Sequence, residues 1–98
     1  MGHDVQRVED LLRAFALSVR SRRQELGLSQ EELAHRSRLH RTYISDIERG
    51  TRNVALVNIV RLAEALDVNP GDLISGLGKK TKQVPSDIAL AEQDIERA

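Results

Sequence analysis

The fold is decided by residues 29–50, whose sequence is SQEELAHRSRLHRTYISDIERG. Ser29 is a residue type that caps helices, and Glu32, three positions later, completes the pattern of a capping box. A tight connection follows at residues 37–40, and the helix after it ends before Gly50, a residue type that stops helices. The stretch therefore predicts two short helices joined by a tight turn.

Apolar residues recur at helical spacing on both sides of this stretch, and no β-strand pattern of any length occurs in the sequence. We expect a long first helix over about residues 4–26, closed by Gly27, and a fourth helix over residues 56–66. A proline after a capping asparagine starts a short fifth helix over residues 70–75. The chain is therefore expected to be all-α, as a compact five-helix bundle.

The end of the chain differs in composition from the rest. Residues 79–98 consist of a polar linker and an acidic tail, in which Ile88 and Ile95 lie on one side of a short sixth helix. At about a dozen residues, such a helix needs a partner surface to be stable. We therefore expect one domain over residues 1–78, with its core at about residues 11–77, and a loosely attached tail.

The composition excludes several classes of protein. The chain has 98 residues and a mass of 11.0 kDa, enough for one domain, and its aromatic residues are Phe15 and Tyr43. It has no cysteine, which excludes a disulfide scaffold, a cysteine nucleophile and a thiolate metal site. The longest uninterrupted apolar stretch is four residues, too short for a membrane span or the core of a signal peptide. We therefore expect a cytoplasmic protein without a membrane partner.

Charge is distributed unevenly along the chain. Lys and Arg together number 15, as do Asp and Glu, so the formal net charge is zero and provides no overall attraction to polyanions. Residues 36–52, however, contain five arginines against Asp46 and Glu48, whereas residues 83–98 contain one arginine against four acidic residues. The segment with the two short helices is therefore basic, and the tail is acidic.

The helix after the tight turn has an apolar and a polar face. Ile44 and Ile47 are three residues apart and face inward, which at about 100° per residue directs the polar side chains outward. Hydroxyls, guanidinium groups and an aromatic ring near an exposed helix start suit entry into a DNA major groove. The residues of this face and of its start are Arg41, Thr42, Tyr43, Ser45, Asp46 and Arg49.

Three blocks of sequence resemble the Xre-type helix-turn-helix family, which includes the lambda- and 434-type phage repressors and Cro. They occur in the order and spacing of that family, and the resemblance covers about residues 15–77. Within the family, residues 39–45 and 47–49 are most similar to the controller proteins of restriction–modification systems. The resemblance implies a lambda repressor-like DNA-binding domain. The three blocks are LGLSQEELA at 26–34, YISDIERG at 43–50 and LAEALDV at 62–68.

The resemblance also implies how contacts to DNA are divided among the residues. Arg41 is the candidate for a bidentate contact to guanine, worth about 1–3 kcal/mol of discrimination, and Thr42 for a contact to thymine or to a base edge. Gln30 either holds a phosphate or supports the recognition helix. The residues expected on the sugar–phosphate backbone are Tyr43, Ser45, Arg49, Arg52 and Asn53.

Two residues depart from the pattern of the family. Arg38 stands in the turn where many members have glycine, which costs of order 1 kcal/mol if the residue is left-handed and is offset by a phosphate contact. Asp46 projects toward DNA, where a carboxylate accepts from a cytosine amino group, so we expect it to contribute to selectivity. The resemblance further implies a largely buried ion pair between Arg23 and Glu48, with a structural role.

The sequence therefore predicts a transcriptional regulator that binds specific double-stranded DNA sequences. One helix contacts about four or five base pairs, so we expect a homodimer on a palindromic or pseudo-palindromic operator, including one at its own promoter, with half-sites about 34 Å apart. We expect the dimer surface at Ile74 and Leu77 of the fifth helix, at the N-terminal part of the first helix, or at Ile88 and Ile95 of the tail. RNA polymerase is a further candidate partner, and DNA binding would associate the protein with the nucleoid.

Other functions predict other features. An antitoxin of the same fold would mask a basic toxin through the acidic tail, and a neighbouring toxin gene and a stable complex would support it. A protein–protein adaptor without DNA binding would carry acidic or apolar residues across the outward face, where Asp46 alone is of that kind. A metal site is not expected, because His35 and His40 are five positions apart across the turn and no carboxylate completes a ligand set. Neither an enzyme nor a cofactor is expected, because the sequence suggests no nucleophile–base pair and contains no glycine-rich phosphate loop.

Overall fold

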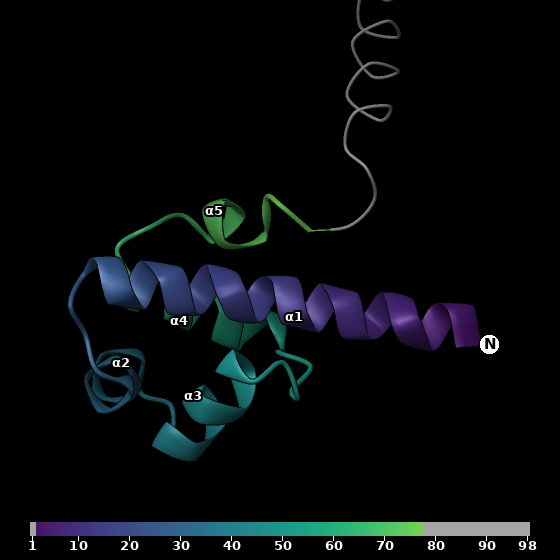
Figure 1. The fold of residues 1–98 in the computed structure, drawn as a ribbon. Helices are drawn as coiled ribbons and strands as arrows, with labels where there is room; N and C mark the ends of the chain where they lie inside the picture. Colours follow the sequence, from purple (N-terminus) through teal and green to yellow (C-terminus); the bar gives the residue numbers. More distant parts are fainter. Residues whose placement is uncertain (1, 78–98) are drawn as a thin grey trace, which may run out of the picture.

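The computed structural model describes residues 2–77, and every regular element within that range is a helix (Figure 1). These five helices confirm the expected all-α fold, and their ends fall within one or two residues of those expected. The expected sixth helix, with Ile88 and Ile95, and the polar linker before it lie outside the described residues. The helices are α1 (Gly2–Glu25), α2 (Gln30–Ser37), α3 (Arg41–Glu48), α4 (Leu56–Ala65) and α5 (Pro70–Ile74).

Reciprocal hydrogen bonds hold the start of α2. Ser29 Oγ accepts from the backbone N–H of Glu32 at 3.0 Å, and the backbone N–H of Ser29 donates to the Glu32 carboxylate at 2.7 Å. These bonds form the expected capping box. The hydrogen bond from the Ser29 backbone, with a smaller contribution from its side chain, lowers the pKa of Glu32. The charged form of Glu32 therefore stabilises this helix start.

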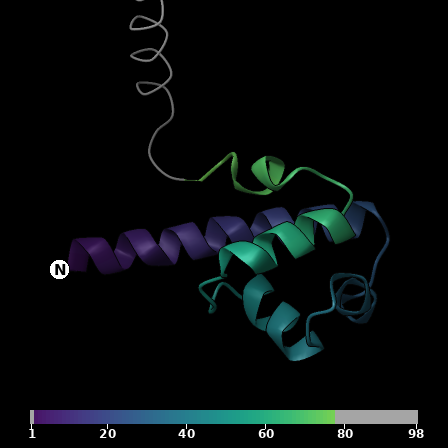
Figure 2. The ribbon, with the colours of Figure 1, turned by 180° about the vertical axis from the view of Figure 1, so that it is seen from behind.

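The core is aliphatic apart from Phe15, and side chains from all five helices contribute to it. In both views α5 lies on one side of α1, and α2 and α3 lie on the other (Figures 1 and 2). The inner side of α3 packs into this core, so the helix cannot rotate without opening it. The largest fully buried side chains are Leu33, Ile44, Ile47, Leu62, Leu66 and Val19.

The turn between α2 and α3 contains a left-handed residue, Arg38, with φ 62° and ψ 34°. An arginine in this conformation costs about 1 kcal/mol or more. The N–H of Leu39 donates to the Ala34 carbonyl at 3.0 Å, and the hydroxyl of the buried Ser37 donates to the Leu33 carbonyl at 2.7 Å. These hydrogen bonds hold the turn in place despite its strained residue, which fixes the angle between α2 and α3.

Gly50 ends α3 at a close approach to α1. It has a φ of +74°, and a Cβ atom at this position would lie 3.4 Å from the Cα of Arg13. Glycine is therefore favoured both by the backbone conformation and by the available space. A left-handed residue that the sequence did not predict, Asp67 with φ 58°, follows α4.

The N-terminal end of α1 extends beyond the other helices (Figure 1). The apolar spacing predicted a helix here, with the core expected from about residue 11, and Val5 and Val8, which precede that point, are 58% and 48% exposed. Burial begins at Phe15 and Val19, where α1 packs against the rest of the bundle, and Figure 1 shows the helix extending beyond it. The spacing predicted the helix correctly but not the extent of its contact.

Candidate nucleic-acid interface

The two faces of α3 are arranged as the sequence predicted. Ile44 and Ile47 are 0% and 1% exposed, so the inner face is fully buried. On the outer side, Arg41 and Thr42 are exposed at the start of the helix, and Ser45 is half-buried one turn later. Within residues 2–77, the Arg41 side chain has no ion pair or side-chain hydrogen bond. The start of α3 therefore offers a guanidinium and a hydroxyl to a binding partner.

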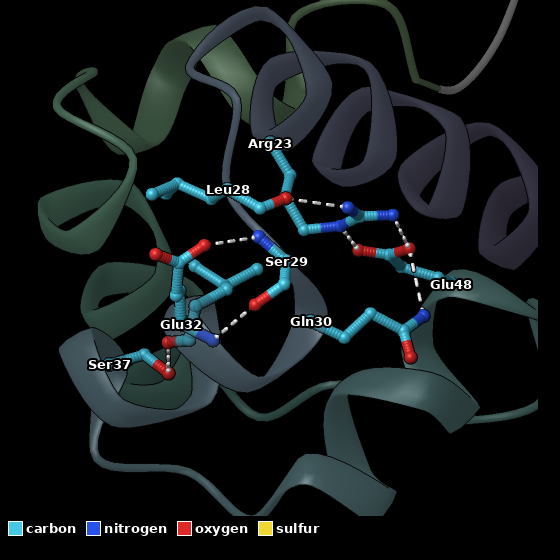
Figure 3. Close-up of polar contacts among 8 residues, drawn as sticks. Arg23, Leu28, Ser29, Gln30, Glu32, Ser37 and Glu48 are labelled. Atoms are coloured by element: carbon cyan, nitrogen blue, oxygen red, sulfur yellow. Dashed lines mark hydrogen bonds and ion pairs between the residues drawn. The ribbon is translucent and has the colours of Figure 1, made fainter.

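A bidentate ion pair joins the end of α3 to α1. Arg23 Nε and Nη2 donate to the two carboxylate oxygens of Glu48 at 2.7 and 2.9 Å (Figure 3). The two side chains are 12% and 4% exposed, and Arg23 Nη1 also donates to the Leu28 carbonyl at 2.8 Å. Gln30 Nε2 donates to Glu48 Oε1 at 3.1 Å. One carboxylate thus ties α3 to both α1 and α2.

Electrostatics and position give this buried cluster a structural role. The hydrogen bond to Glu48 raises the pKa of Arg23, against the opposite effect of burial. Both side chains of the pair are largely shielded from solvent. Of the two roles expected for Gln30, the structure shows support of α3, because the amide nitrogen of its side chain donates to Glu48.

On the outer face of α3, Asp46 is the partner of two arginines. Arg49 and Arg52 both direct a guanidinium nitrogen to its carboxylate, and Arg52 Nη2 lies 3.2 Å from Oδ2. Arg49 Nη1 also donates to Ser45 Oγ at 2.7 Å. The Asp46 side chain is 19% exposed, whereas those of Arg49 and Arg52 are 61% and 48% exposed. The carboxylate expected to project toward DNA is thus engaged within the protein; Ser45, Asp46, Arg49 and Arg52 form the Asp46 cluster.

Tyr43 links the Asp46 cluster to α4. The guanidinium carbon of Arg52 lies 5.0 Å from the centroid of the Tyr43 ring, a cation–π distance. The Tyr43 hydroxyl accepts from Asn58 Nδ2 at 3.1 Å. The ring is half-buried and packs against the core, whereas the sequence favoured a contact residue over a core residue at this position. Sequence reasoning missed Asn58, because nothing in the pattern of α4 distinguishes it from a solvated polar residue.

The other expected contact residues lie around three separate hollows. A shallow hollow of about 360 Å³ at the start of α3 is lined by Arg38, Thr42, Tyr43 and Arg52, among others. Arg38 also lines a polar hollow of about 530 Å³ between α2 and α4. Asn53 instead lines an apolar groove of about 250 Å³, together with Ile74 and Leu77. Most of the predicted contact residues thus lie around α3, whereas Asn53 lies at the apolar groove with Ile74 and Leu77.

The histidines do not form a metal site in the part of the chain that is described. His35 and His40 are exposed, and no group of three or more histidine, cysteine or carboxylate side chains within residues 2–77 is placed to hold a metal ion. In the same range, no helix combines the length and the apolar character needed to cross a membrane.

Comparison with known proteins agrees with this arrangement. Residues 19–73, more than half of the chain, match the helix-turn-helix family HTH_3. The control protein C.SmaI of Serratia marcescens is 45% identical over 74 residues, which are 76% of this chain and 88% of that protein. The control protein C.BamHI of Bacillus amyloliquefaciens is 62% identical over 48 residues, which are 49% of this chain and 59% of that protein, less than two thirds of its length.

Solved structures of controller proteins share the fold. The restriction–modification controller protein C.AhdI from Aeromonas hydrophila is 52% identical with a TM-score of 0.62, over 63% of this chain and 94% of that one. C.Esp1396I, in a structure of its tetramer with its natural 35-base-pair operator, is 35% identical with a TM-score of 0.62, over 66% of this chain and 86% of that one. The chain therefore belongs to the helix-turn-helix family, and restriction–modification control proteins are among its relatives.

Proposed function

We propose that the protein is a transcriptional regulator that binds specific double-stranded DNA sequences as a homodimer. Its operators would be palindromic or pseudo-palindromic, and one of them would lie at the promoter of its own gene. The observation that carries the proposal is the fixed position of α3, whose inner face is buried and whose end is tied down through Glu48. A helix held in this way can enter a major groove without reordering. Its relative C.Esp1396I forms a complex with operator DNA.

The proposed contacts follow from exposure and position. Arg41 and Thr42, exposed at the start of α3, would read base edges, because this end of a recognition helix reaches into the groove. Positively charged and polar side chains around it would hold phosphates and set the register of the protein on the duplex. Gln30 supports α3 through Glu48, and Asn53 lines the groove between α1 and α5 instead. The backbone contacts would be made by Arg38, Tyr43, Ser45, Arg49 and Arg52.

Footprinting on the DNA upstream of the protein's own gene tests this function. The wild-type protein should protect two half-sites about 34 Å apart. Arg41→Ala should relax preference at one base pair, whereas Arg52→Ala should weaken binding to all sequences and reduce the salt slope by about one unit. Arg20→Ala, at an exposed position on α1, is the matched control and should change neither. No protection by the wild-type protein at low salt would refute the proposal.

The groove between α1 and α5 is the proposed dimer surface. Val8 and Ile74 line it and are 48% and 42% exposed, although both are large apolar residues. A two-fold contact between copies would remove this apolar surface from water, which favours association. The apolar residues of the groove include Val8, Leu11, Leu12, Ile59, Ile74 and Leu77.

Sedimentation of substituted proteins locates the dimer surface. Ile74→Asp should yield a monomer, because a charge in the groove would be buried without a partner. Leu17→Asp is the control, since Leu17 is 60% exposed on α1 and does not line the groove. The double substitution Ile88→Asp and Ile95→Asp tests the tail. A dimer that survives Ile74→Asp but not the tail substitutions would place the interface in the tail.

The exposed arginine and threonine at the start of α3 favour DNA over a protein partner. An adaptor would present apolar or acidic surface there, whereas Arg41 and Thr42 are exposed. The toxin-masking surface of an antitoxin would be the acidic tail, which lies outside the described residues. The proposed regulator would act in the cytoplasm together with DNA, without enzymatic activity or a cofactor. RNA polymerase is a further candidate partner.

A further inference from the structure

The two arginines expected to hold the operator backbone after α3 are already paired within the protein. Arg49 and Arg52 share the carboxylate of Asp46, and Arg52 is held a second time by the Tyr43 ring. Arg41, the expected base-contacting arginine, has no such partner within residues 2–77. The expected backbone contacts are thus restrained before DNA arrives, and the expected base contact is not.

We propose that Asp46 is a positioning residue that determines specificity: it holds Arg49 and Arg52 in place for the operator and offsets their charge toward all other DNA. This inference rests on the proposed function. It does not require the carboxylate to touch a base, in contrast to the contact to cytosine that the sequence suggested.

Non-operator DNA is bound mainly through phosphates. Each phosphate that a cation neutralises contributes about −0.9 to the slope of log affinity against log salt concentration. Arginines that share a carboxylate partner bring less net positive charge to the duplex than unpaired arginines. Because the Arg49 and Arg52 side chains are 61% and 48% exposed, they face solvent and are available to any duplex that approaches. The Asp46 carboxylate therefore weakens binding to DNA of any sequence.

Operator binding also depends on where the arginines are held. Arginine has several rotatable bonds, and fixing such a side chain in an interface costs entropy. In the Asp46 cluster, Asp46 and Ser45 already hold Arg49, and Asp46 and Tyr43 already hold Arg52. Without the carboxylate, the two arginine side chains would have to be ordered when they bind the operator. This entropic cost opposes the stronger attraction of the unpaired arginines to phosphate. Operator affinity should therefore respond less than non-operator affinity does.

Asp46 can be substituted without disturbing the end of α3. The backbone N–H and the hydroxyl of Thr51 both donate to the backbone carbonyl of Asp46, each at 3.1 Å, so these bonds do not depend on its carboxylate. Asp67→Asn makes the same change of charge and is the matched control. Asp67 is exposed between α4 and α5, and asparagine tolerates its left-handed backbone.

The experiment compares affinities for the operator and for a scrambled duplex of equal length between 50 and 200 mM salt, conditions under which counterion release is resolved. Asp46→Asn should raise affinity for the scrambled duplex about five- to tenfold near 0.1 M salt and steepen its salt slope by about one unit. Operator affinity should change by less than about threefold, so the ratio of the two affinities should fall. Asp67→Asn should match the wild-type protein in every measurement.

Three results would overturn the inference. In the first, the affinity of Asp46→Asn for the scrambled duplex stays unchanged. In the second, the affinities for both duplexes rise equally, which would mean that the carboxylate acts only as a repulsive charge. A loss of operator affinity alone would instead indicate a direct base contact by Asp46. Absence of any operator preference in the wild-type protein would refute the proposed function itself, so the two failures are distinguishable.

Discussion

Helix α3 carries two carboxylates paired with arginines, and their surroundings differ. Glu48 is 4% exposed and its partner Arg23 is 12% exposed, whereas Asp46 is 19% exposed and its partner Arg49 is 61% exposed. The first pair is shielded from solvent and joins helices; the second lies at the surface, within the neighbourhood of one helix end. The shielded Arg23–Glu48 pair therefore stabilises the fold, whereas the solvated Arg49–Asp46 pair can exchange its partners with water or phosphate.

The two ion pairs differ in the free energy needed to separate the arginine from its carboxylate. A buried arginine that loses its carboxylate keeps a charge with little hydration, so the pair stays closed. An exposed arginine that leaves its carboxylate is rehydrated or meets a phosphate, so the exchange costs little. A guanidinium has five N–H donors, so Arg49 and Arg52 can bind phosphates while Asp46 still positions them, whereas Arg23 cannot leave Glu48 without disturbing the fold.

The largest effect on stability is expected from breaking the buried pair. Glu48→Ala leaves the Arg23 guanidinium without its bidentate partner and should lower the free energy of unfolding by about 3–5 kcal/mol. Urea unfolding followed by circular dichroism measures this change. Glu31→Ala, at an exposed position on α2, serves as the control and should change the free energy by less than about 0.5 kcal/mol. A loss below about 1 kcal/mol in Glu48→Ala would show that the pair is hydrated in solution.

Replacing both partners should cost less than removing one. In the double substitution Arg23→Met and Glu48→Leu, no charge is left unpaired, although Gln30 loses its acceptor and the Leu28 carbonyl loses its donor. The free energy of unfolding should return to within about 1–2 kcal/mol of the wild-type value. A double-mutant cycle in urea quantifies the coupling. If the double variant lost as much free energy of unfolding as the two single variants together, the two side chains would not depend on each other, which would contradict this interpretation.

Much of the fold follows from local patterns in the sequence. The capping box at Ser29 and Glu32, the glycine at 50 and the spacing of Ile44 and Ile47 each act within a few residues, and the structure has each of them. The exposure of Val8 was not predictable in this way. Periodicity shows which side of a helix is apolar, but only the tertiary arrangement decides how much of that side is covered.

The candidate site was predicted by residue type but not by contact. The sequence placed Asp46 on the outer face of α3, yet its partner Arg52 lies beyond the end of the helix, where loop geometry decides the contact. Asn58 was missed because its bond to Tyr43 joins two helices, and the pattern of α4 alone does not show this contact. The Arg23–Glu48 contact joins residues far apart in the chain, and it was expected from the family resemblance rather than from spacing.

The exposed pair should contribute little to stability. Arg49→Ala removes the contacts of Arg49 to Asp46 and Ser45 at the surface, and the free energy of unfolding should fall by no more than about 1 kcal/mol. The difference from wild type should shrink further in 1 M salt, where exposed charges are screened within about 3 Å. Urea unfolding at low and high salt gives both values. A loss as large as that of Glu48→Ala would remove the distinction between the two pairs.

The smallest effect is expected at Glu32, whose pKa is lowered mainly by its hydrogen bond to the Ser29 backbone. A carboxyl group whose pKa is lower in the folded protein stabilises it above the unfolded pKa, near pH 4.3, and loses that contribution as the pH falls through the folded value. Glu32→Gln keeps an acceptor for the capping box but has no charge to lose. The variant should therefore be slightly less stable than wild type at pH 7, and the difference should shrink as the pH falls below the unfolded pKa. Urea midpoints of both proteins from pH 7 downward measure it, and a difference that does not shrink with falling pH would mean that packing, rather than charge, accounts for the contribution of Glu32.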